Sequence, residues 1–185
     1  MVKLLGVKAT PGGQHPARGT KNALLALGPT AYLEIIGPDP DQPAPKEPRS
    51  FGIDRLTQAK LVTWAVKATD LAELRNEMDS KGVHYEEVRA GSRQRPDGIR
   101  LAWEVINPAV SKDSLPFFID WGQSPHPAVT AAKGAALVSL RAEHPNASVL
   151  DPMLKKLGID LPVTNGPGPA LIAVIECPKG KVELR

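Results

Sequence analysis

The residue types most able to do chemistry begin near the start of the chain, where an acidic side chain interrupts an apolar segment. Glu34 lies in the middle of AYLEIIG (31–37), and His15 lies in a Gly/Pro-rich turn ahead of it. Burying a carboxylate without a partner costs several kcal/mol. Glu34 therefore needs a metal ion, an arginine or water in a cleft as its partner, unless it faces solvent on an edge strand.

Two later segments repeat this placement of an acidic residue. Asp120 lies in FFIDWG (117–122), and Glu183 lies in KVEL (181–184), with Glu176 as the alternative for the last segment. Each would stand in a late strand, where a metal ion or a cleft would explain a carboxylate. The simpler interpretation, an edge or solvent-facing position, stays open for all of them.

His15 is the candidate acid or base beside Glu34. A hairpin formed by residues 21–37 would bring His15 close to both Asn22 and Glu34. The pKa of histidine lies near neutral pH, so its imidazole can take up or release a proton, or bind an anion when charged. The alternative interpretation is a loop histidine that hydrogen-bonds the turn.

Other loops carry groups that could contact a ligand. His126 stands between two prolines, in a rigid loop that could close over the mouth of a cleft. Arg93 and Arg95 lie close to a turn, and guanidinium groups bind carboxylates through two parallel hydrogen bonds. A solvated hairpin tip is the plainer interpretation of these arginines. Trp121 follows Asp120 and would form either a pocket wall or part of the core.

The elements that must position these residues are mostly strands. Apolar runs bounded by Gly and Pro predict strands, and two amphipathic segments predict helices. Asp70 is the expected N-cap of the first helix, and Gly82 is the glycine expected just after it. The expected strands are 21–28, 31–37, 60–67, 84–91, 98–106, 115–122, 134–142, 170–177 and 181–184, and the expected helices are 70–82 and 147–159.

The order of the elements repeats along the chain. Residues 60–122 predict a βαβββ unit, residues 134–185 restart the same pattern, and such units usually pair because one alone leaves a sheet face bare. The first unit, 1–48, shows two strands without a leading strand and helix, so we expect the chain to begin where that helix ends. The fold class expected for 1–185 is α+β, with repeated units forming curled mixed sheets around a half-open barrel cleft. An extended Pro-rich surface loop is expected at 37–48.

Composition narrows the class of protein. The 185 residues are 42% hydrophobic and 23% charged with a net charge of +3, values typical of a soluble globular protein. The basic residues are scattered and aromatic residues are few, which argues against nucleic-acid binding. No apolar run approaches the ~20 residues that span a membrane. The lone cysteine, Cys177, excludes an internal disulfide or a cysteine-based zinc site and fits a cytoplasmic location.

Several sequence blocks resemble the vicinal oxygen chelate superfamily, and within it the glyoxalase-like domain branch. GGQHPARGTKNALLAL followed by AYLEIIGPDP is similar to the Gly-Gly-x-His-Pro, Gly-Thr-x-Asn, Tyr-Leu-Glu run of that branch, and LPFFIDWGQSPHP (115–127) is similar to the same branch. CPKGKVEL resembles the Pro-x-Gly-x-x-Glu end of such a unit. The resemblance covers nearly all of the chain and implies paired units curled around a half-open barrel.

The resemblance also implies a chemistry. In this superfamily a divalent metal, such as Zn, Ni, Fe or Mn, is often held by His, Gln and Glu side chains and acts as a Lewis acid. Glu34, Asp120 and Glu183 match the acidic ligand positions. The chain departs from the pattern because the strands that match the one carrying the first ligand have no histidine, and offer residues such as Thr63 and Ser139 instead.

Two classes of function follow from these residues. The first is a glyoxalase-like lyase, isomerase or dioxygenase acting on a small oxygenated organic molecule, with Glu34 and His15 as catalytic residues. The second is a non-catalytic protein that binds or sequesters a small molecule in the same cleft. A chain that lacks its first strand would also expose a sheet edge, which favours a homodimer. The expected ligand-contacting residues are Asn22, Tyr32, Thr63, Arg93, Arg95, Trp121 and His126.

Overall fold

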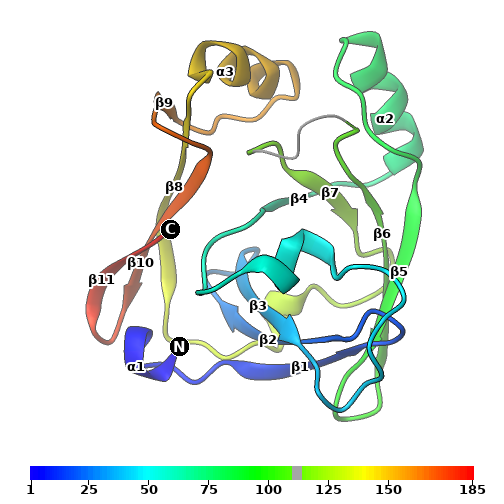
Figure 1. Cartoon of the computed structure of the whole chain (residues 1–185), viewed down its shortest axis with the longest axis vertical. Coiled ribbons are helices and arrows are strands. Elements are labelled where there is room, and N and C mark those ends of the chain that lie inside the picture. The colour runs from blue at the N-terminus through cyan, green and yellow to red at the C-terminus, as the bar shows by residue number, and fades with distance from the viewer. Residues whose placement is uncertain (110–113) are drawn as a thin grey trace.

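The chain folds into two β-sheets accompanied by short helices (Figure 1). The computed structural model describes residues 1–109 and 114–185. The helices are α1 (Val2–Leu5), α2 (Leu71–Ser80) and α3 (Ala147–Lys156), with the 3-10 helices η1 (Ser50–Arg55) and η2 (Pro127–Val129). The strands are β1 (Thr10–His15), β2 (Thr20–Ala26), β3 (Tyr32–Pro38), β4 (Ala65–Lys67), β5 (Arg89–Gln94), β6 (Arg100–Ile106), β7 (Phe117–Asp120), β8 (Ala136–His144), β9 (Val163–Asn165), β10 (Ala170–Cys177) and β11 (Gly180–Leu184). No helix within the described ranges is long and apolar enough to cross a membrane.

The larger sheet has the strand order β3-β2-β1-β5-β6-β7-β4. Its neighbouring strands are antiparallel except β4 and β7, which run parallel. Figure 1 shows this sheet curling from β3 and β2, past β5 and β6, to β7 and β4, so that it has a concave side. The smaller sheet has the order β11-β10-β8-β9. The α+β fold with curled mixed sheets around a half-open barrel is therefore confirmed.

The repeated order of elements is visible in the structure. β4, α2, β5, β6 and β7 form the unit expected at 60–122, and β8, α3, β9, β10 and β11 form the last unit. The first unit contains α1 and three strands, one strand more than the sequence predicts. The unexpected strands, β1 and β9, are short or rich in glycine and proline, so no apolar alternation marks them.

β1 is the strand that the sequence analysis interprets as a Gly/Pro-rich turn. Its residues, TPGGQH, include types that are depleted in strands. Gly13 is required here because its φ is +131° and an added Cβ would lie 2.0 Å from the carbonyl oxygen of Gln94 in β5. A register shift between Pro11 and Gly13 marks a bulge. β1 thereby joins the first two units, since it pairs with β2 on one side and β5 on the other.

The convex side of the larger sheet is covered by α2. The Asp70 side chain accepts a hydrogen bond from the Glu73 backbone N–H, and Gly82 has a φ of +74°, so both expected ends of this helix are confirmed. The helix packs on β6 and β7 through a buried cluster that includes Leu71, Met78, Ile106 and Phe118. Because side chains alternate along a strand, the neighbours of Phe118 in β7 face the concave side.

Two of the expected strands begin several residues later than the sequence predicts. Of the strand expected at 60–67, only Ala65–Lys67 pairs as β4. The Leu61 backbone N–H donates instead to the Arg185 carbonyl, just after β11, at 3.0 Å, and the Trp64 indole N–H donates to the Ser114 carbonyl at 2.9 Å. The strand expected at 84–91 begins at Arg89 as β5. Tyr85 instead forms an isolated bridge to Pro108.

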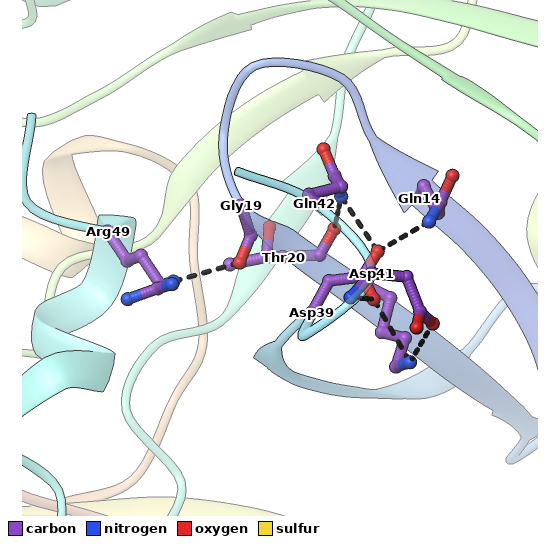
Figure 2. Close-up of polar contacts among 8 residues, drawn as sticks. Gln14, Gly19, Thr20, Asp39, Asp41, Gln42 and Arg49 are labelled. Carbon is purple, nitrogen blue, oxygen red and sulfur yellow. Dashed lines mark hydrogen bonds and ion pairs between the residues drawn. The ribbon is translucent and has the colours of Figure 1, made fainter. Parts of the chain in front are cut away.

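The Pro-rich segment after β3 lies on the surface, as expected, but its first residue is buried. Figure 2 shows Asp39 at the centre of a polar network, where its carboxylate accepts hydrogen bonds from the Gln14 side chain at 2.7 Å and the Gln42 side chain at 2.9 Å. Lys21 forms an ion pair with it at 3.0 Å. The hydrogen bond from Gln42 is the largest of the effects that hold the pKa of Asp39 below its usual value.

Two further hydrogen bonds fasten the same loop to the turn between β1 and β2. The Gln42 amide donates to the Thr20 carbonyl at 3.0 Å, and the Arg49 Nε donates to the Gly19 carbonyl at 2.8 Å (Figure 2). The loop therefore holds the hairpin that carries His15 and Asn22.

Candidate functional site

His15, Asn22 and Glu34 lie on one face of three adjacent strands. Glu34 of β3 stands opposite Leu24 of β2, and Asn22 is two residues from Leu24, so their side chains share a face. In β1, His15 stands opposite Thr20, again on this face. The packing of α2 on the opposite side identifies this face as the concave one.

Direct contacts join these three side chains. The Asn22 amide nitrogen donates to Glu34 Oε1 at 2.7 Å and lies 3.4 Å from His15 Nε2. His15 Nε2 is 3.9 Å from the same Glu34 oxygen, and His15 Nδ1 is 3.0 Å from Thr20 Oγ1. Asn22 can only donate through this nitrogen, so we assign the imidazole proton to Nδ1 and the lone pair to Nε2.

The electrostatics of the cluster favour a neutral imidazole. Burial is the main cause that lowers the pKa of His15, and the positive charges of Arg93 and Arg18 lower it further, while the Glu34 carboxylate acts in the opposite direction. Burial also raises the pKa of Tyr32, on the Glu34 face of β3, so its hydroxyl remains a hydrogen-bond donor at neutral pH.

Aromatic rings form the wall around the polar cluster. The Trp103 ring meets His15 edge-on with centroids 6.4 Å apart, and Trp121 lies 5.2 Å from Trp103. Tyr32 packs edge-on against His126 at 5.4 Å. The indole nitrogen of Trp121 is buried without a hydrogen-bond partner among the described residues. The site thus combines an apolar wall with a few polar groups, a common composition of small-molecule pockets.

Arg93 adds a buried positive charge beside this cluster. The residue is only 3% exposed, and its guanidinium donates to the carbonyl oxygen of Gly12 in β1. Burial is the main cause that lowers the pKa of Arg93. Arg95 pairs with Asp97 at 2.6 Å, and both arginines line a hollow of about 230 Å³.

Three predicted site residues are not brought to the cluster. Asp120 stands opposite Glu104 on the convex face, where its carboxylate accepts a hydrogen bond from the Gly122 N–H. Glu183 lies in the smaller sheet and pairs with Arg185 at 2.9 Å. Thr63 precedes β4 and lies outside that strand.

The metal that the resemblance implies would need a set of donor side chains around Glu34. His15 and Glu34 offer one imidazole nitrogen and one carboxylate close together. Among residues 1–109 and 114–185, no group of three His, Cys, Asp or Glu side chains is placed to hold a metal ion. A catalytic zinc site has three protein ligands, so these two donors are fewer than such a site needs.

Trp103 and Thr20 belong to the site but were not among its predicted residues. The sequence does not predict Trp103 as a site residue, because a tryptophan in an apolar strand is usually part of the core. A glycine opposite a tryptophan is the feature that points to Trp103. Trp103 stands opposite Gly91, and a Cβ added at Gly91 would lie 2.4 Å from the indole nitrogen of Trp103. A large ring facing a glycine across a strand pair indicates a side chain folded over the sheet.

Comparisons with known proteins agree with this fold. The sequence profile described as Glyoxalase-like domain matches residues 1–158, and the chain belongs to that family, within the vicinal oxygen chelate superfamily. A crystal structure of a hypothetical protein from Staphylococcus aureus shares the fold, with a TM-score of 0.60 and 15% sequence identity over 96% of this chain and 75% of that one. No curated protein matches the chain significantly.

Proposed function

We propose that the concave side binds a small oxygenated organic molecule and that Glu34 removes a proton from it. The observation that carries this proposal is the contact of Glu34 with Asn22 at 2.7 Å beside the buried imidazole of His15. The Glu34 side chain is 36% exposed and the His15 side chain 12%. A ligand can therefore reach the carboxylate, while Asn22 and His15 hold it in place.

Proton abstraction next to a carbonyl group is the reaction that this arrangement supports best. The substrate C–H bond would break, its proton would move to a Glu34 oxygen, and the electron pair would pass to the carbonyl oxygen as an enolate. Tyr32 would supply a hydrogen-bond donor on the same face. Proton transfer of this kind belongs to the lyase and isomerase chemistry proposed for a glyoxalase-like protein.

A bound divalent metal stays a prediction for this chain. Of the ligands proposed from the sequence, only Glu34 lies in the cluster, because Asp120 and Glu183 stand on other faces. The proton transfer proposed for Glu34 does not depend on a metal. Metal loading is nevertheless one arm of the experiment.

Non-catalytic binding of a small molecule is the second candidate function. It is favoured by the aromatic wall of Trp103, Trp121 and Tyr32, which stabilises an apolar ligand without any proton transfer. The two functions differ in one observable, the exchange of a ligand C–H hydrogen with solvent.

The experiment follows hydrogen exchange by NMR in D₂O for a panel of small 2-oxoaldehydes, hydroxyketones and catechols, with and without added Zn, Ni, Fe or Mn. The tested variant is Glu34→Gln, and the control is Glu104→Gln on the convex face. Exchange that the control retains and Glu34→Gln loses supports the catalytic proposal. Saturable binding without exchange supports the binding function instead, and the absence of both contradicts the proposed site.

A further inference from the structure

The three arginines in and just after β5 differ in whether a carboxylate pairs with them. Arg89 pairs with Glu86 at 3.3 Å and Arg95 pairs with Asp97 at 2.6 Å. Arg93, between them in sequence, is 3% exposed and takes part in none of the ion pairs found among the described residues. The most buried of the three guanidinium groups is thus the one without a carboxylate partner.

An unpaired buried cation is an unfavourable arrangement in a folded protein. Transfer of a charged group out of water is costly unless a counter-charge and hydrogen bonds replace its hydration. Gly12 supplies one carbonyl oxygen, but an arginine carries five N–H donors in a planar fork. The negative charge of Glu34 acts on Arg93 from beyond ion-pair distance. The positive charge of Arg93 is therefore not fully compensated, and a bound anion would neutralise it.

A hollow of about 230 Å³ gives an anion access to Arg93. Its lining includes Thr10, Pro11 and Gly12 of β1, Leu24 of β2, and Arg95. The hollow adjoins the polar cluster, because a Cβ at Gly12 would lie 2.1 Å from Asn22 Oδ1 and 3.4 Å from an Arg93 nitrogen. Leu24 is also the cross-strand partner of Glu34.

We propose that Arg93 binds the carboxylate of a small organic acid that enters through this hollow, so that the ligand of the Glu34 site is an anion. The planar guanidinium matches the two oxygens of a carboxylate. Glu34 then faces the part of the ligand beyond its carboxylate. This inference rests on the proposed function, which it deepens by naming the class of ligand.

The test compares small acids with their neutral amides. Acetate and glycolate, then acetamide and glycolamide, are titrated at constant ionic strength while the thermal unfolding midpoint and tryptophan fluorescence are followed. Constant ionic strength removes general screening effects. We expect saturable stabilisation by the acids and none by the amides.

Variants assign the effect to Arg93. Arg93→Gln keeps much of the side-chain volume and removes the charge, and we expect it to weaken acid binding by about 10-fold to 100-fold, the loss typical of a charged hydrogen-bonded contact. Arg93→Lys keeps the charge without the fork and should bind with intermediate affinity. Arg89→Gln, at an exposed and paired position of the same strand, is the control and should bind the acids as the wild type does.

Several outcomes would overturn the inference: equal binding of acids and amides, unchanged acid binding by Arg93→Gln, stabilisation by inorganic phosphate alone, or no binding of any acid by the wild type. If Arg93→Gln does not fold, the Nε–H signal of Arg93 in the wild type must shift when acid is added. Glu34→Gln separates the two proposals. If Glu34→Gln loses hydrogen exchange but still binds the acids, both proposals are supported. If Arg93→Gln keeps the hydrogen exchange of the wild type, only the assignment of the carboxylate to Arg93 is refuted.

Discussion

Replacing Asn22 by Asp tests the central contact of the site without changing the shape of the side chain. The change puts a carboxylate oxygen where the Asn22 amide nitrogen now lies, 2.7 Å from Glu34 Oε1. A hydrogen bond to a charged acceptor is lost, and two like charges come into contact at neutral pH. Such a pair relieves its repulsion by sharing one proton.

The size of the effect follows from the distance and the exposure. Two unit charges 2.7 Å apart repel by about 6 kcal/mol at an effective dielectric constant of about 20. The Glu34 side chain is 36% exposed, so solvent reduces this to about 2–3 kcal/mol, which raises the upper pKa of the pair by about 2 units. The lost hydrogen bond adds about 1.5–3 kcal/mol. At pH 8 the variant should therefore be less stable by about 3.5–6 kcal/mol.

The pH dependence separates this mechanism from a general packing defect. The folded variant binds a proton more tightly than the unfolded chain does, so its free energy of unfolding must fall as pH rises from about 4 to about 6. Urea unfolding followed by tryptophan fluorescence measures this difference at each pH. Asn165→Asp, at an exposed strand position, is the control and should change stability by less than about 0.5 kcal/mol. A variant as stable as the wild type at pH 8, or a deficit that does not change with pH, would refute the reasoning.

Three further predictions concern the strands and the loop that hold the site. Gly13→Ala should destabilise by about 2–4 kcal/mol in urea unfolding, because its Cβ would lie 2.0 Å from a backbone oxygen, whereas Gly37→Ala, with nothing within 4 Å, should be nearly neutral. The lowered pKa of His15 means that the unfolded chain binds the proton more readily, so stability should fall as pH drops through about 6.5, and His15→Gln should flatten that slope; an unchanged slope would contradict the burial of His15. Asp39→Asn should speed limited proteolysis of the 39–49 loop without changing the far-ultraviolet circular dichroism spectrum, which reports the β-sheet content. Equal cleavage rates for the variant and the wild type would show that the network of Figure 2 does not hold the loop.

The strands and helices that the sequence predicts are those with long apolar patterns. α2, β6 and β10 bury one or both faces, and burial leaves a period in the sequence that identifies them. β1 leaves no such period. The β5 backbone approaches β1 so closely that glycine is required there. Glycine has no side chain, so the apolar alternation from which a strand is predicted is missing.

Those site residues that lie close together along the chain could be predicted from the sequence. A hairpin is a short-range structure, so the proximity of His15, Asn22 and Glu34 follows from their separation along the chain. Asp120 was assigned to the same site from the resemblance. Its position on the convex face depends on the side from which α2 covers β7, a long-range property that alternation alone does not determine. The burial of Arg93 is likewise a result of the contact between units, through β1 and β5.

A carboxylate bound to Arg93 should change the protonation of His15. Burial is the main cause that lowers the pKa of His15, and the positive charge of Arg93 lowers it further. An anion on Arg93 cancels that charge, so the pKa of His15 rises on binding and the protein takes up protons when the pH lies near that value. Because the two equilibria are linked, affinity for the acid must increase as pH falls through this range.

Titration calorimetry measures this uptake as the dependence of the binding enthalpy on the ionisation enthalpy of the buffer. We expect a fraction of a proton taken up per acid bound between about pH 5 and 7, where histidine titrates. His15→Gln should lose most of the uptake, while His84→Gln, at an exposed position, should retain it. Uptake that persists in His15→Gln would place the titrating group elsewhere. No uptake at any pH in this range would mean that the anion does not neutralise Arg93, and the charge balance argued for the concave side would be wrong.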